Sequence, residues 1–489
     1  MMKTYANAQT QKEAEREIGS SFGAPAEWTE ETDVVVVGSG FAGLAAAAEA
    51  ALAGARTVVL EKMAHFGGNS LISGGGYCCW DSKLKLREKL GLGDDSWQSH
   101  MRDTLRGGAY YNDPELVEVL VREAPEGLDW LVDAGAVFED TLPRIGGHSA
   151  HRSHQGKNSS GAHIVQALKR LATERGADLR LNAKVTGIWR KDANACVSGV
   201  RVVSEGVTRD IRALRGVILA SGGYGRDLAL RLNNNPRLVE SLNCTNHSGA
   251  TGEMIRHAKA IGADTVHMAF VQLYPCAAPR NGAMDRFAFD CYSGPGYGLI
   301  YVNRAGERFV NELAGRDEVS DAQVLCGEKP TWSVLNGRIF EKLTTPPKTI
   351  QKGIDSGRLL KGDSLSALAE KAGLPPAALE NSVRAHNGAI TAQEDTLFHK
   401  PMSPYMIPLE EPPFYALAQW PAVHYCMGGI RINAQCGVFD IWGDLIPGLY
   451  AAGEVCGGIH GANRLGGNAI AECVVFGRRA GKVVSNQAD

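Results

Sequence analysis

The sequence lacks the cysteine patterns that bind haem or iron–sulfur clusters. Its 489 residues include 11 cysteines, of which Cys78 and Cys79 are adjacent, but no C-x-x-C pair, no ferredoxin spacing and no C-x-x-C-H motif. A disulfide between two adjacent cysteines would be strained. We therefore expect free thiols in a reducing compartment, the cytoplasm, and no haem or metal relay for electrons within the chain.

Long apolar runs and a large net charge are also absent. The longest apolar stretch, Phe41 to Ala55, is interrupted by Glu49, so we expect no membrane span. The first residues, Met1 to Thr32, are polar and lack the apolar core of a signal peptide. The formal net charge of -3 gives no reason to expect nucleic acid or an anionic membrane as a partner.

Glycine, by contrast, is in excess. The chain has 58 glycines, about 12% of its residues against a usual ~7%, and they cluster in motifs. Such clusters indicate a backbone that approaches a ligand closely. The hydrophobic content of 44% and the length of 489 residues predict a globular protein with two domains.

A βαβ pattern begins at residue 33. The run Asp33 to Val37 is β-branched and too short for a helix, which predicts a buried parallel strand. An alanine-rich helix extends to about Ala53, and a second strand covers Arg56 to Glu61. This order of elements is typical of a dinucleotide-binding domain.

The turn of this unit carries the fingerprint G-x-G-x-x-G at Gly38, Gly40 and Gly43. The first glycine makes the turn, the second lets the backbone reach a pyrophosphate, and the third lets helix and strand pack closely. Glu61 follows about 20 residues later, where a carboxylate accepts from ribose hydroxyls. A lone fingerprint is weak evidence, but this context favours nucleotide binding over a generic glycine-rich turn.

Two later segments belong with the same sheet. Arg215 to Gly223 predicts a buried strand that ends in a glycine turn, and Gly448 to Glu454 predicts a short strand that ends in Gly-Glu. The second closes over the ribityl and diphosphate of a flavin, and the glycine-rich arm His460 to Ala469 places one arginine beside the isoalloxazine. Because both ends of the chain contribute motifs, the cofactor indicated is FAD rather than NAD.

The middle of the chain has a different pattern. From about Ala269 to Val423, turn signals, aromatic residues and helices such as Leu365 to Ala372 replace the glycine-bounded strands. We predict an α/β fold: a Rossmann-like FAD-binding domain at 32–268 and 424–489, with an inserted α+β capping domain at 269–423. Residues 1–31 form a polar leader.

These motifs together resemble the flavoprotein subunit family of fumarate reductases and succinate dehydrogenases. The similarity covers roughly Thr32 to Val484 and is greatest for the soluble, flavocytochrome-like branch, which includes urocanate reductase. It implies a substrate held between the capping domain and the flavin, and hydride transfer between flavin N5 and a carbon of a C=C bond. The segment Gly68 to Ser73 has no histidine for covalent attachment, which implies dissociable FAD.

The resemblance also assigns roles to individual residues. Arg316, in the run Phe309 to Asp317, matches the proton-transferring arginine of the family. His424 and Arg464 match the pair that holds a substrate carboxylate, and Gly467 lies in the same substrate loop. An arginine fork binds a carboxylate bidentately, which makes the β-carbon a better hydride acceptor.

The predicted contacts to FAD lie in the fingerprint, in the two glycine loops that follow the second strand, and in the closing segment. Those glycine loops could lie against a flat ring system or serve as structural turns. The predicted cofactor-binding residues are Gly38, Gly40, Ala42, Gly43, Glu61, Lys62, Asn69, Ser70, Gly74, Gly75, Val185, Ser221, Gly222, Glu253, Tyr425, Gly453, Glu454, Asn468, Ala469 and Ile470.

Structural alternatives exist for several of these residues. Arg316 could pair with Asp317 or Glu312, and His424 alone is more typical of a histidine satisfied within the core. His148, His151 and His154 have a spacing that metal sites use, yet this segment resembles a loop near the substrate or the flavin in the family, so we expect no metal.

The chain departs from the dicarboxylate enzymes where they bind the second carboxylate. Tyr274 replaces a histidine two residues after Gln272, Cys291 and Tyr292 replace a Thr-Glu pair, and Pro295 replaces a relay arginine. An unpaired buried carboxylate costs roughly several kcal/mol. Fumarate and succinate are therefore not the expected substrates.

Two directions of reaction stay open. The protein could reduce an α,β-unsaturated carboxylate or keto compound that is cyclic or aryl, with Arg316, Tyr274 and Tyr292 as candidate catalytic groups. It could instead desaturate a cyclic keto acid or a 3-ketosteroid-like ketone, with a tyrosinate or Arg316 taking the proton. In both cases oxygen, a quinone or a carrier protein must exchange electrons with the flavin. A third hypothesis is an electron-transfer flavoprotein subunit of a larger complex.

Overall fold

The computed structural model describes residues 22–343 and 345–486, which form two compact units. Unit 1 combines the described residues of 1–238, 246–271 and 425–489, and unit 2 combines 239–245 with 272–424. The proposed leader, residues 1–31, lies outside the described residues up to position 21. The last two residues of this leader already belong to a strand, because β1 begins at Glu30.

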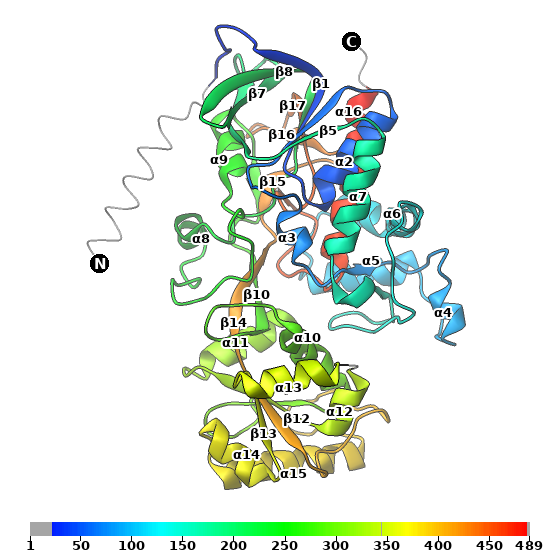
Figure 1. Ribbon diagram of the computed structural model, residues 1–489, viewed down its shortest axis with the longest axis vertical. Helices are drawn as coiled ribbons and strands as arrows, with labels where there is room; N and C mark the ends of the chain where they lie inside the picture. The colour runs from blue at the N-terminus through cyan, green and yellow to red at the C-terminus, as the bar shows by residue number, and fades with distance from the viewer. Residues whose placement is uncertain (1–21, 344, 487–489) are drawn as a thin grey trace, which may run out of the picture. The chain divides into compact units, whose positions relative to one another are not determined.

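Unit 1 is built on a twisted sheet in the order β16-β17-β8-β1-β2-β5 (Figure 1). All neighbours pair in parallel except β16 and β17, and Val36 in the centre lies opposite both Val59 and Ile218. Runs of buried valine and leucine are typical of strands covered on both faces. The strands are β1 (Glu30–Val37), β2 (Thr57–Leu60), β5 (Asp178–Arg180), β8 (Val207–Leu219), β16 (Gly437–Phe439) and β17 (Leu445–Ala451).

Smaller sheets complete this unit. Strand β8 continues into an antiparallel meander with β6 (Ala183–Arg190) and β7 (Val197–Ser204). Strands β3 (Gly76–Cys78) and β4 (Ser153–Gln155) form an antiparallel pair. Strand β15 (Gly429–Arg431) lies between β9 (Thr265–Val266) and β18 (Cys456–Gly457).

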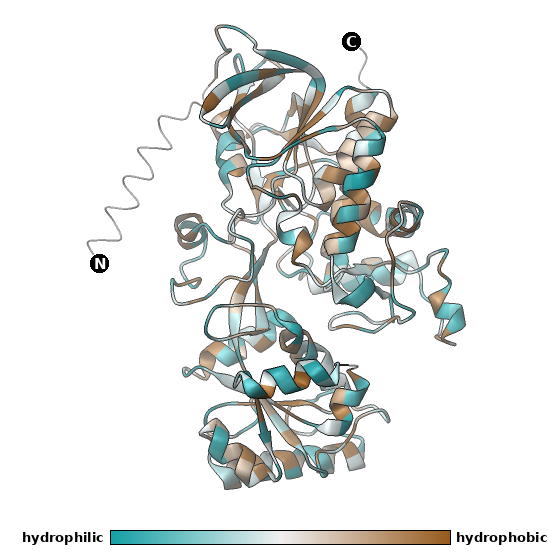
Figure 2. Cartoon of the chain, viewed as in Figure 1, coloured by the Kyte–Doolittle hydropathy of each residue, from teal (hydrophilic) through white to brown (hydrophobic). Residues whose placement is uncertain are grey.

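Helices and a short 3₁₀ turn complete unit 1. They are α2 (Phe41–Leu52), α3 (Gly68–Leu71), α4 (Leu86–Lys89), α5 (Trp97–Gly107), α6 (Pro114–Asp133), α7 (Ala162–Glu174), α8 (Leu228–Asn234), α9 (Glu253–Ala260) and α16 (Asn468–Ser485), with a 3₁₀ turn η1 (Lys157–Ser159). Helix α6 begins where the Asp113 side chain accepts from the amide of Glu115, followed by Pro114 at the first position. Figure 2 shows both hydrophilic and hydrophobic residues in α7, and the buried ones recur at helical spacing, as in an amphipathic helix: Ile164, Val165, Ala167, Leu168 and Ala172.

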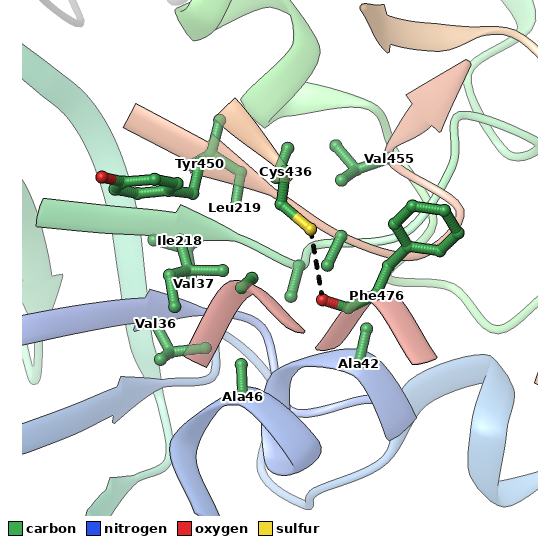
Figure 3. Packing of buried hydrophobic residues seen from close by; sticks show 14 of the residues in the cluster. Val36, Val37, Ala42, Ala46, Ile218, Leu219, Cys436, Tyr450, Val455 and Phe476 are labelled. Carbon is green, nitrogen blue, oxygen red and sulfur yellow. Dashed lines mark hydrogen bonds between the residues drawn. The ribbon is translucent and has the colours of Figure 1, made fainter. Parts of the chain in front are cut away.

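Helices α2 and α16 approach each other closely because small residues face across the contact. A Cβ atom on Gly477 would lie 2.4 Å from the carbonyl oxygen of Ala42, and one on Gly481 would lie 2.3 Å from that of Ala46. Figure 3 shows the alanines of α2 next to the strands, with the thiol of Cys436 donating to the carbonyl of Phe476 at 3.5 Å. The close packing of Gly477 and Gly481 on α2 holds α16 against the unit formed by β1 and α2.

Unit 2 is an antiparallel sheet with helices. Its strand order is β10-β14-β12-β11, with β13 also paired to β14. The strands are β10 (Val271–Ala277), β11 (Ile300–Val302), β12 (Thr331–Asn336), β13 (Leu359–Gly362) and β14 (Phe414–Cys426). The helices are α10 (Arg286–Ser293), α11 (Arg316–Leu325), α12 (Gly337–Lys342), α13 (Pro347–Asp355), α14 (Leu365–Ala372) and α15 (Pro376–Ala392), with a 3₁₀ turn η2 (Gly294–Tyr297). The predicted α/β fold, a parallel sheet interrupted by a second unit, is confirmed.

A buried ionic cluster holds the segment that precedes α11. Glu312 accepts from Arg308 at 2.9 Å and lies 3.1 Å from the ammonium of Lys400, and Arg308 also reaches Asp395 at 2.8 Å. These cations lower the pKa of Glu312 although its burial alone would raise it. Glu312 is therefore engaged by Arg308 and Lys400 rather than serving as the partner weighed for Arg316.

Candidate active site

The turn between β1 and α2 forms the floor of a cleft in unit 1. Gly38 has φ +104°, and a Cβ there would lie 2.4 Å from the carbonyl oxygen of Ala220. A Cβ on Gly43 would lie 2.0 Å from the carbonyl of Gly38, so the third glycine serves close packing. Helix α2 has Gly40 as its N-cap, and its first residues line the cleft, so the positive end of the helix lies where it favours a phosphate.

The cleft has a volume of about 930 Å³, which includes space that is open to solvent. Its walls come from β1, β2, the loop before α3, the start of α9 and the segment after β17. Of the residues predicted to bind the cofactor, the following line it: Gly38, Gly40, Ala42, Glu61, Lys62, Asn69, Ser70, Val185, Ser221, Gly222, Glu253, Gly453 and Glu454.

Glu61 stands at the end of β2 with its carboxylate fixed. One oxygen accepts from the amide and hydroxyl of Ser39 at 3.2 and 2.5 Å, and the other accepts from the amide of Met63 at 2.9 Å. Carboxylate oxygens have further lone pairs for ribose hydroxyls. Ser39 also accepts from the amide of Gly67 at 3.1 Å and so joins the fingerprint to the next loop.

The loop that begins at Gly67 is tied to its neighbours by two side chains. Ser70 accepts from the amide of Phe41 at 3.0 Å, and Asn69 accepts from the amide of His247 at 2.7 Å. On the opposite wall Lys62 donates to Glu253 at 2.6 Å. His247 and the glycines beside it lack any fingerprint, which is why sequence reasoning missed them.

Glu454 is the most strongly shifted acid of the cleft. It accepts from the amide of Cys426 at 3.0 Å and from the side chain of Asn69 at 3.4 Å. Burial raises its pKa from 4.5 to about 7 despite these donors. At neutral pH this carboxyl is therefore partly protonated and can both donate and accept a hydrogen bond.

A second cluster of polar side chains in unit 1 surrounds Arg464. Its guanidinium carbon lies 4.6 Å from the ring centre of Tyr425, and its Nη1 donates to the carbonyl of Leu465 at 2.9 Å. The hydroxyl of Tyr425 donates to the buried Glu472 at 2.6 Å, and His460 lies 3.1 Å from the same oxygen. Tyr425 is therefore fixed at both its face and its hydroxyl.

In unit 2 the first residue of α11 lies between aromatic rings. Arg316 donates to the side-chain oxygen of Gln272 at 3.0 Å, and its guanidinium carbon lies 5.0 Å from the ring centre of Tyr274 and 4.6 Å from that of Tyr292. These contacts hold the cation by hydrogen bonding on one side and by two π faces on the other. The structure thus brings together Arg316, Tyr274 and Tyr292 as the sequence predicts.

His424 stands at the other side of the same cluster. Its ring centre lies 5.1 Å from that of Tyr274, and its Nδ1 lies 2.8 Å from the hydroxyl oxygen of Thr245. Thr245 comes from the short stretch 239–245 that belongs to unit 2. Sequence reasoning missed Thr245 because nothing local marks it.

The comparison with known families settles the cofactor. Residues 33–470 match the family described as FAD binding domain. The chain belongs to this family. The cleft fits the cofactor, since its glycine floor, the N-terminus of α2 and the fixed carboxylate of Glu61 match the diphosphate and ribose of a dinucleotide. The protein is a flavin-dependent oxidoreductase with FAD as its cofactor.

Similar proteins of known activity cover nearly the whole chain. The acrylate reductase flavoprotein subunit of Shewanella woodyi is 36% identical over 472 residues, 94% of this chain and 92% of that protein. The urocanate reductase of Eggerthella lenta is 34% identical over 94% of this chain and 75% of the relative. A fumarate reductase (cytochrome) of Shewanella frigidimarina is 36% identical over 92% and 76%. The predicted resemblance is confirmed.

Solved structures agree with this assignment. The open conformation of a flavocytochrome c3 fumarate reductase has a TM-score of 0.76 at 34% identity, covering 94% of this chain and 79% of that one. A 3-ketosteroid dehydrogenase from Rhodococcus jostii has a TM-score of 0.74 at 24% identity, covering 96% and 100%. The second similarity shows a shared fold.

Seven of the residues predicted to contact FAD do not line the FAD cleft: Gly43, Gly74, Gly75, Tyr425, Asn468, Ala469 and Ile470. A Cβ on Gly75 would lie 2.5 Å from the carbonyl of Ser160, so this glycine allows loop packing. The side chain of Asn468 is occupied by His100 at 2.9 Å and Thr104 at 3.0 Å. Asn468 to Ile470 form the first turn of α16, whose N-cap is Gly467.

Of the two tyrosines predicted as catalytic groups, Tyr274 has its hydroxyl engaged within unit 2. Its hydroxyl donates to the carbonyl of Ala288 at 3.0 Å, and burial raises its pKa well above 10. The phenol is thus used to anchor β10 to α10. Cys291 is likewise fully buried, and burial raises the pKa of its thiol, so this position presents no anion-binding group.

The histidines with metal-like spacing serve separate contacts. His148 lies 2.8 Å from the carbonyl of Gly466, His151 lies 2.9 Å from that of Leu142, and His154 lies 3.1 Å from the hydroxyl of Ser82. Within residues 22–343 and 345–486, no three His, Cys, Asp or Glu side chains converge as metal ligands. In the same ranges no helix is long and apolar enough to cross a bilayer.

Proposed function

We propose that the protein reduces the C=C bond of an α,β-unsaturated carboxylate that carries one carboxylate group and is cyclic or aryl. The observation that supports this most is the surroundings of Arg316. Its guanidinium lies over two tyrosine rings, and the hydroxyl of the inner one, Tyr274, is used by Ala288. Aromatic faces suit an apolar or ring-shaped substrate end, and the engaged hydroxyl of Tyr274 is not left as a donor for a second carboxylate.

In this proposal the carboxylate is bound by Arg464 and His424. The Arg464 fork is oriented by the ring of Tyr425, which Glu472 anchors in turn. Charge-assisted hydrogen bonds to the carboxylate hold the substrate and draw electron density away from the β-carbon. Gly467 shapes the loop that follows, since a Cβ there would lie 2.4 Å from the Sγ of Cys78.

Proton transfer is the proposed role of Arg316. Reduced FAD, when bound, supplies a hydride to the β-carbon, and the guanidinium gives a proton to the α-carbon. Neutral arginine is very basic, so it must be reprotonated at once. Tyr292 contacts the guanidinium and Gln272 accepts from it, so both keep the group aimed at one point.

The names of the relatives include substrates with one carboxylate and with two, so the preference for one carboxylate rests on the surroundings of Arg316. Acrylate and urocanate each carry one, whereas fumarate carries two, and an enzyme for each is similar to this chain. The desaturase alternative needs a base that accepts a proton from carbon. Tyr274 does not supply one, because its hydroxyl is a donor to Ala288 and burial raises its pKa. Because the relatives named above are called reductases, we favour the reductive direction.

We further propose that FAD is bound without a covalent link and that electrons come from a separate carrier. The noncovalent link is supported by Asn69 and Ser70 in the loop where the covalent branch has a histidine. The separate carrier is supported by the lack of haem and iron–sulfur motifs in the sequence. Release of all yellow cofactor into the supernatant after acid precipitation tests the first point. The cytoplasmic location stays a prediction.

An anaerobic turnover screen tests the proposed function. Holoenzyme reduced with dithionite is mixed with acrylate, cinnamate, urocanate or fumarate, and the return of oxidised flavin absorbance is followed. We expect an acid with one carboxylate to reoxidise the flavin fastest. Bleaching of oxidised enzyme by saturated keto acids, with no reoxidation by any unsaturated acid, would instead show a dehydrogenase.

A further inference from the structure

The imidazole of His424 is held in one orientation by a residue with no assigned role. The hydroxyl oxygen of Thr245 lies 2.8 Å from Nδ1. The Tyr274 ring lies against the same imidazole with its centre 5.1 Å away, at 44° between the planes. A rotation of the imidazole by half a turn would replace Nδ1 with a carbon and lose the hydrogen bond to Thr245.

The backbone fixes Thr245 at this place. Its amide donates to the carbonyl of Val423 at 2.8 Å, and the amide of Val423 donates to the carbonyl of Asn243 at 2.8 Å. Cys244 and Val423 form a parallel bridge between these bonds. The stretch 239–245 thus runs beside the end of β14, and the hydroxyl faces the residue that follows Val423.

Tyr274 is itself immobile, so both supports of the imidazole are rigid. Its hydroxyl donates to the carbonyl of Ala288 at 3.0 Å, and its side chain is 1% exposed. Its other neighbour, Tyr292, has a ring centre 5.6 Å away. The imidazole therefore has a hydrogen bond at one edge and a fixed ring at one face.

The direction of this hydrogen bond is coupled to the tautomer of the imidazole, since the hydroxyl either donates to a bare Nδ1 or accepts from an Nδ1–H. A neutral imidazole has one N–H and one bare nitrogen, and a group that binds Nδ1 as a donor leaves the proton on Nε2. A carboxylate only accepts hydrogen bonds, so it needs that Nε2–H. A threonine hydroxyl can donate its proton to Nδ1, which a valine of the same shape cannot.

We infer that Thr245 is a positioning residue that keeps His424 as the Nε2–H tautomer, ready to donate to the carboxylate of the substrate. This inference rests on the proposed role of His424. It goes beyond that role by naming the group that sets the proton and the direction of the imidazole. Thr245 touches neither the substrate nor the reacting atoms, and its effect passes through His424.

Labelled histidine reports the tautomer directly in the holoenzyme. In ¹⁵N-histidine protein, the signals of His424 are assigned by their loss in His424→Gln. We expect the Nε2–H tautomer in the wild type and in Thr245→Ser, and a mixture of both tautomers in Thr245→Val. An Nδ1–H tautomer in the wild type, or an unchanged tautomer in Thr245→Val, overturns the inference.

Kinetics with cinnamate, an aryl acid with one carboxylate, separate this inference from the proposed function. We expect Thr245→Val to raise KM about tenfold and leave kcat within about threefold, which corresponds to about 1.4 kcal/mol of ground-state binding. Thr245→Ser should restore the wild-type KM. Thr391→Val removes an exposed hydroxyl on α15 and is the matched control.

Failure of the proposed function and failure of the inference about Thr245 give different values of KM in the variants. If His424→Gln leaves the KM for the acid unchanged, the proposed carboxylate role fails. If His424→Gln raises KM but Thr245→Val does not, the inference about Thr245 alone fails. Melting temperature and flavin absorbance of each variant confirm folding. The tautomer measurement does not depend on turnover of the acid.

Discussion

The hydroxyl of Tyr274 donates to the backbone carbonyl of Ala288 at 3.0 Å. Sequence reasoning made this tyrosine a candidate base, but the structure uses its phenol to join β10 and α10. Its ring, by contrast, contacts both Arg316 and His424. The ring and the hydroxyl of Tyr274 therefore have separate roles, and a substitution can remove one of them alone.

The first prediction concerns the hydroxyl of Tyr274. Tyr274→Phe keeps the ring and leaves the Ala288 carbonyl without its donor, so the free energy of unfolding should fall by about 1–2 kcal/mol. Turnover of the best acid should change by less than about threefold. Chemical denaturation and steady-state kinetics check both values. A loss of turnover by more than about a hundredfold in a folded, yellow variant would restore Tyr274 as a catalytic base.

The second prediction concerns Arg316. Arg316→Gln keeps a hydrogen bond to Gln272 within reach but removes the proton donor, so kcat should fall by roughly 10²–10⁴-fold, as for loss of a general acid. FAD absorbance and melting temperature should stay close to wild type, because the FAD cleft lies in unit 1. Rapid mixing of the reduced variant with substrate measures the chemical step. Unchanged kcat would reject the assignment of Arg316.

The third prediction is a pH dependence that arises at Glu454. Burial raises its folded pKa to about 7 from 4.5, so its contribution to stability is complete below 4.5 and is lost as pH rises through 7. Between pH 5 and 8 the apoprotein should lose about 2 kcal/mol through this group. Glu454→Gln should remove that loss. Denaturant unfolding of both apoproteins at the two pH values gives the comparison; parallel pH profiles would contradict the shifted pKa.

The fourth prediction uses two glycines in helices. Gly477→Ala in α16 should destabilise unit 1 by roughly 1–3 kcal/mol, because its Cβ would lie 2.4 Å from the carbonyl of Ala42. Gly388→Ala in α15 meets nothing within 4 Å and should stabilise unit 2 by about 0.5–1 kcal/mol. Calorimetry of both variants checks the opposite signs. If Gly477→Ala changed stability in the same direction and by the same amount as Gly388→Ala, α2 and α16 would have room to separate.

Local patterns in the sequence predict the parts of the fold that are themselves local. The β-branched run before Gly38, the alanine-rich helix after it and Glu61 at the end of the next strand all lie where the sequence places them. Their spacing is set by backbone geometry within about 30 residues. The close contact of Gly477 with α2 could not be predicted, because a glycine within a helix gives no sign of what faces it.

The residues of the candidate site also divide into those that a local motif predicts and those that it does not. Arg316, with the tyrosines of unit 2, could be selected because a motif surrounds it, and the structure places these residues together. Thr245 could not be selected, because its contact to His424 joins positions 179 residues apart in the chain. The use of the Tyr274 hydroxyl by Ala288 is also invisible in the sequence, since a tyrosine carries no sign of its hydrogen-bond partner.

The central claim is that the substrate has one carboxylate and that its other end meets aromatic rings. The most direct measurement is the ratio of kcat/KM for an unsaturated acid with one carboxylate to that for fumarate, taken with reduced holoenzyme at fixed pH and donor concentration. We predict that the best of acrylate, cinnamate and urocanate exceeds fumarate by at least about a hundredfold, since an unpaired carboxylate costs roughly 3 kcal/mol or more. A kcat/KM for fumarate equal to or above that of all three acids would contradict the account.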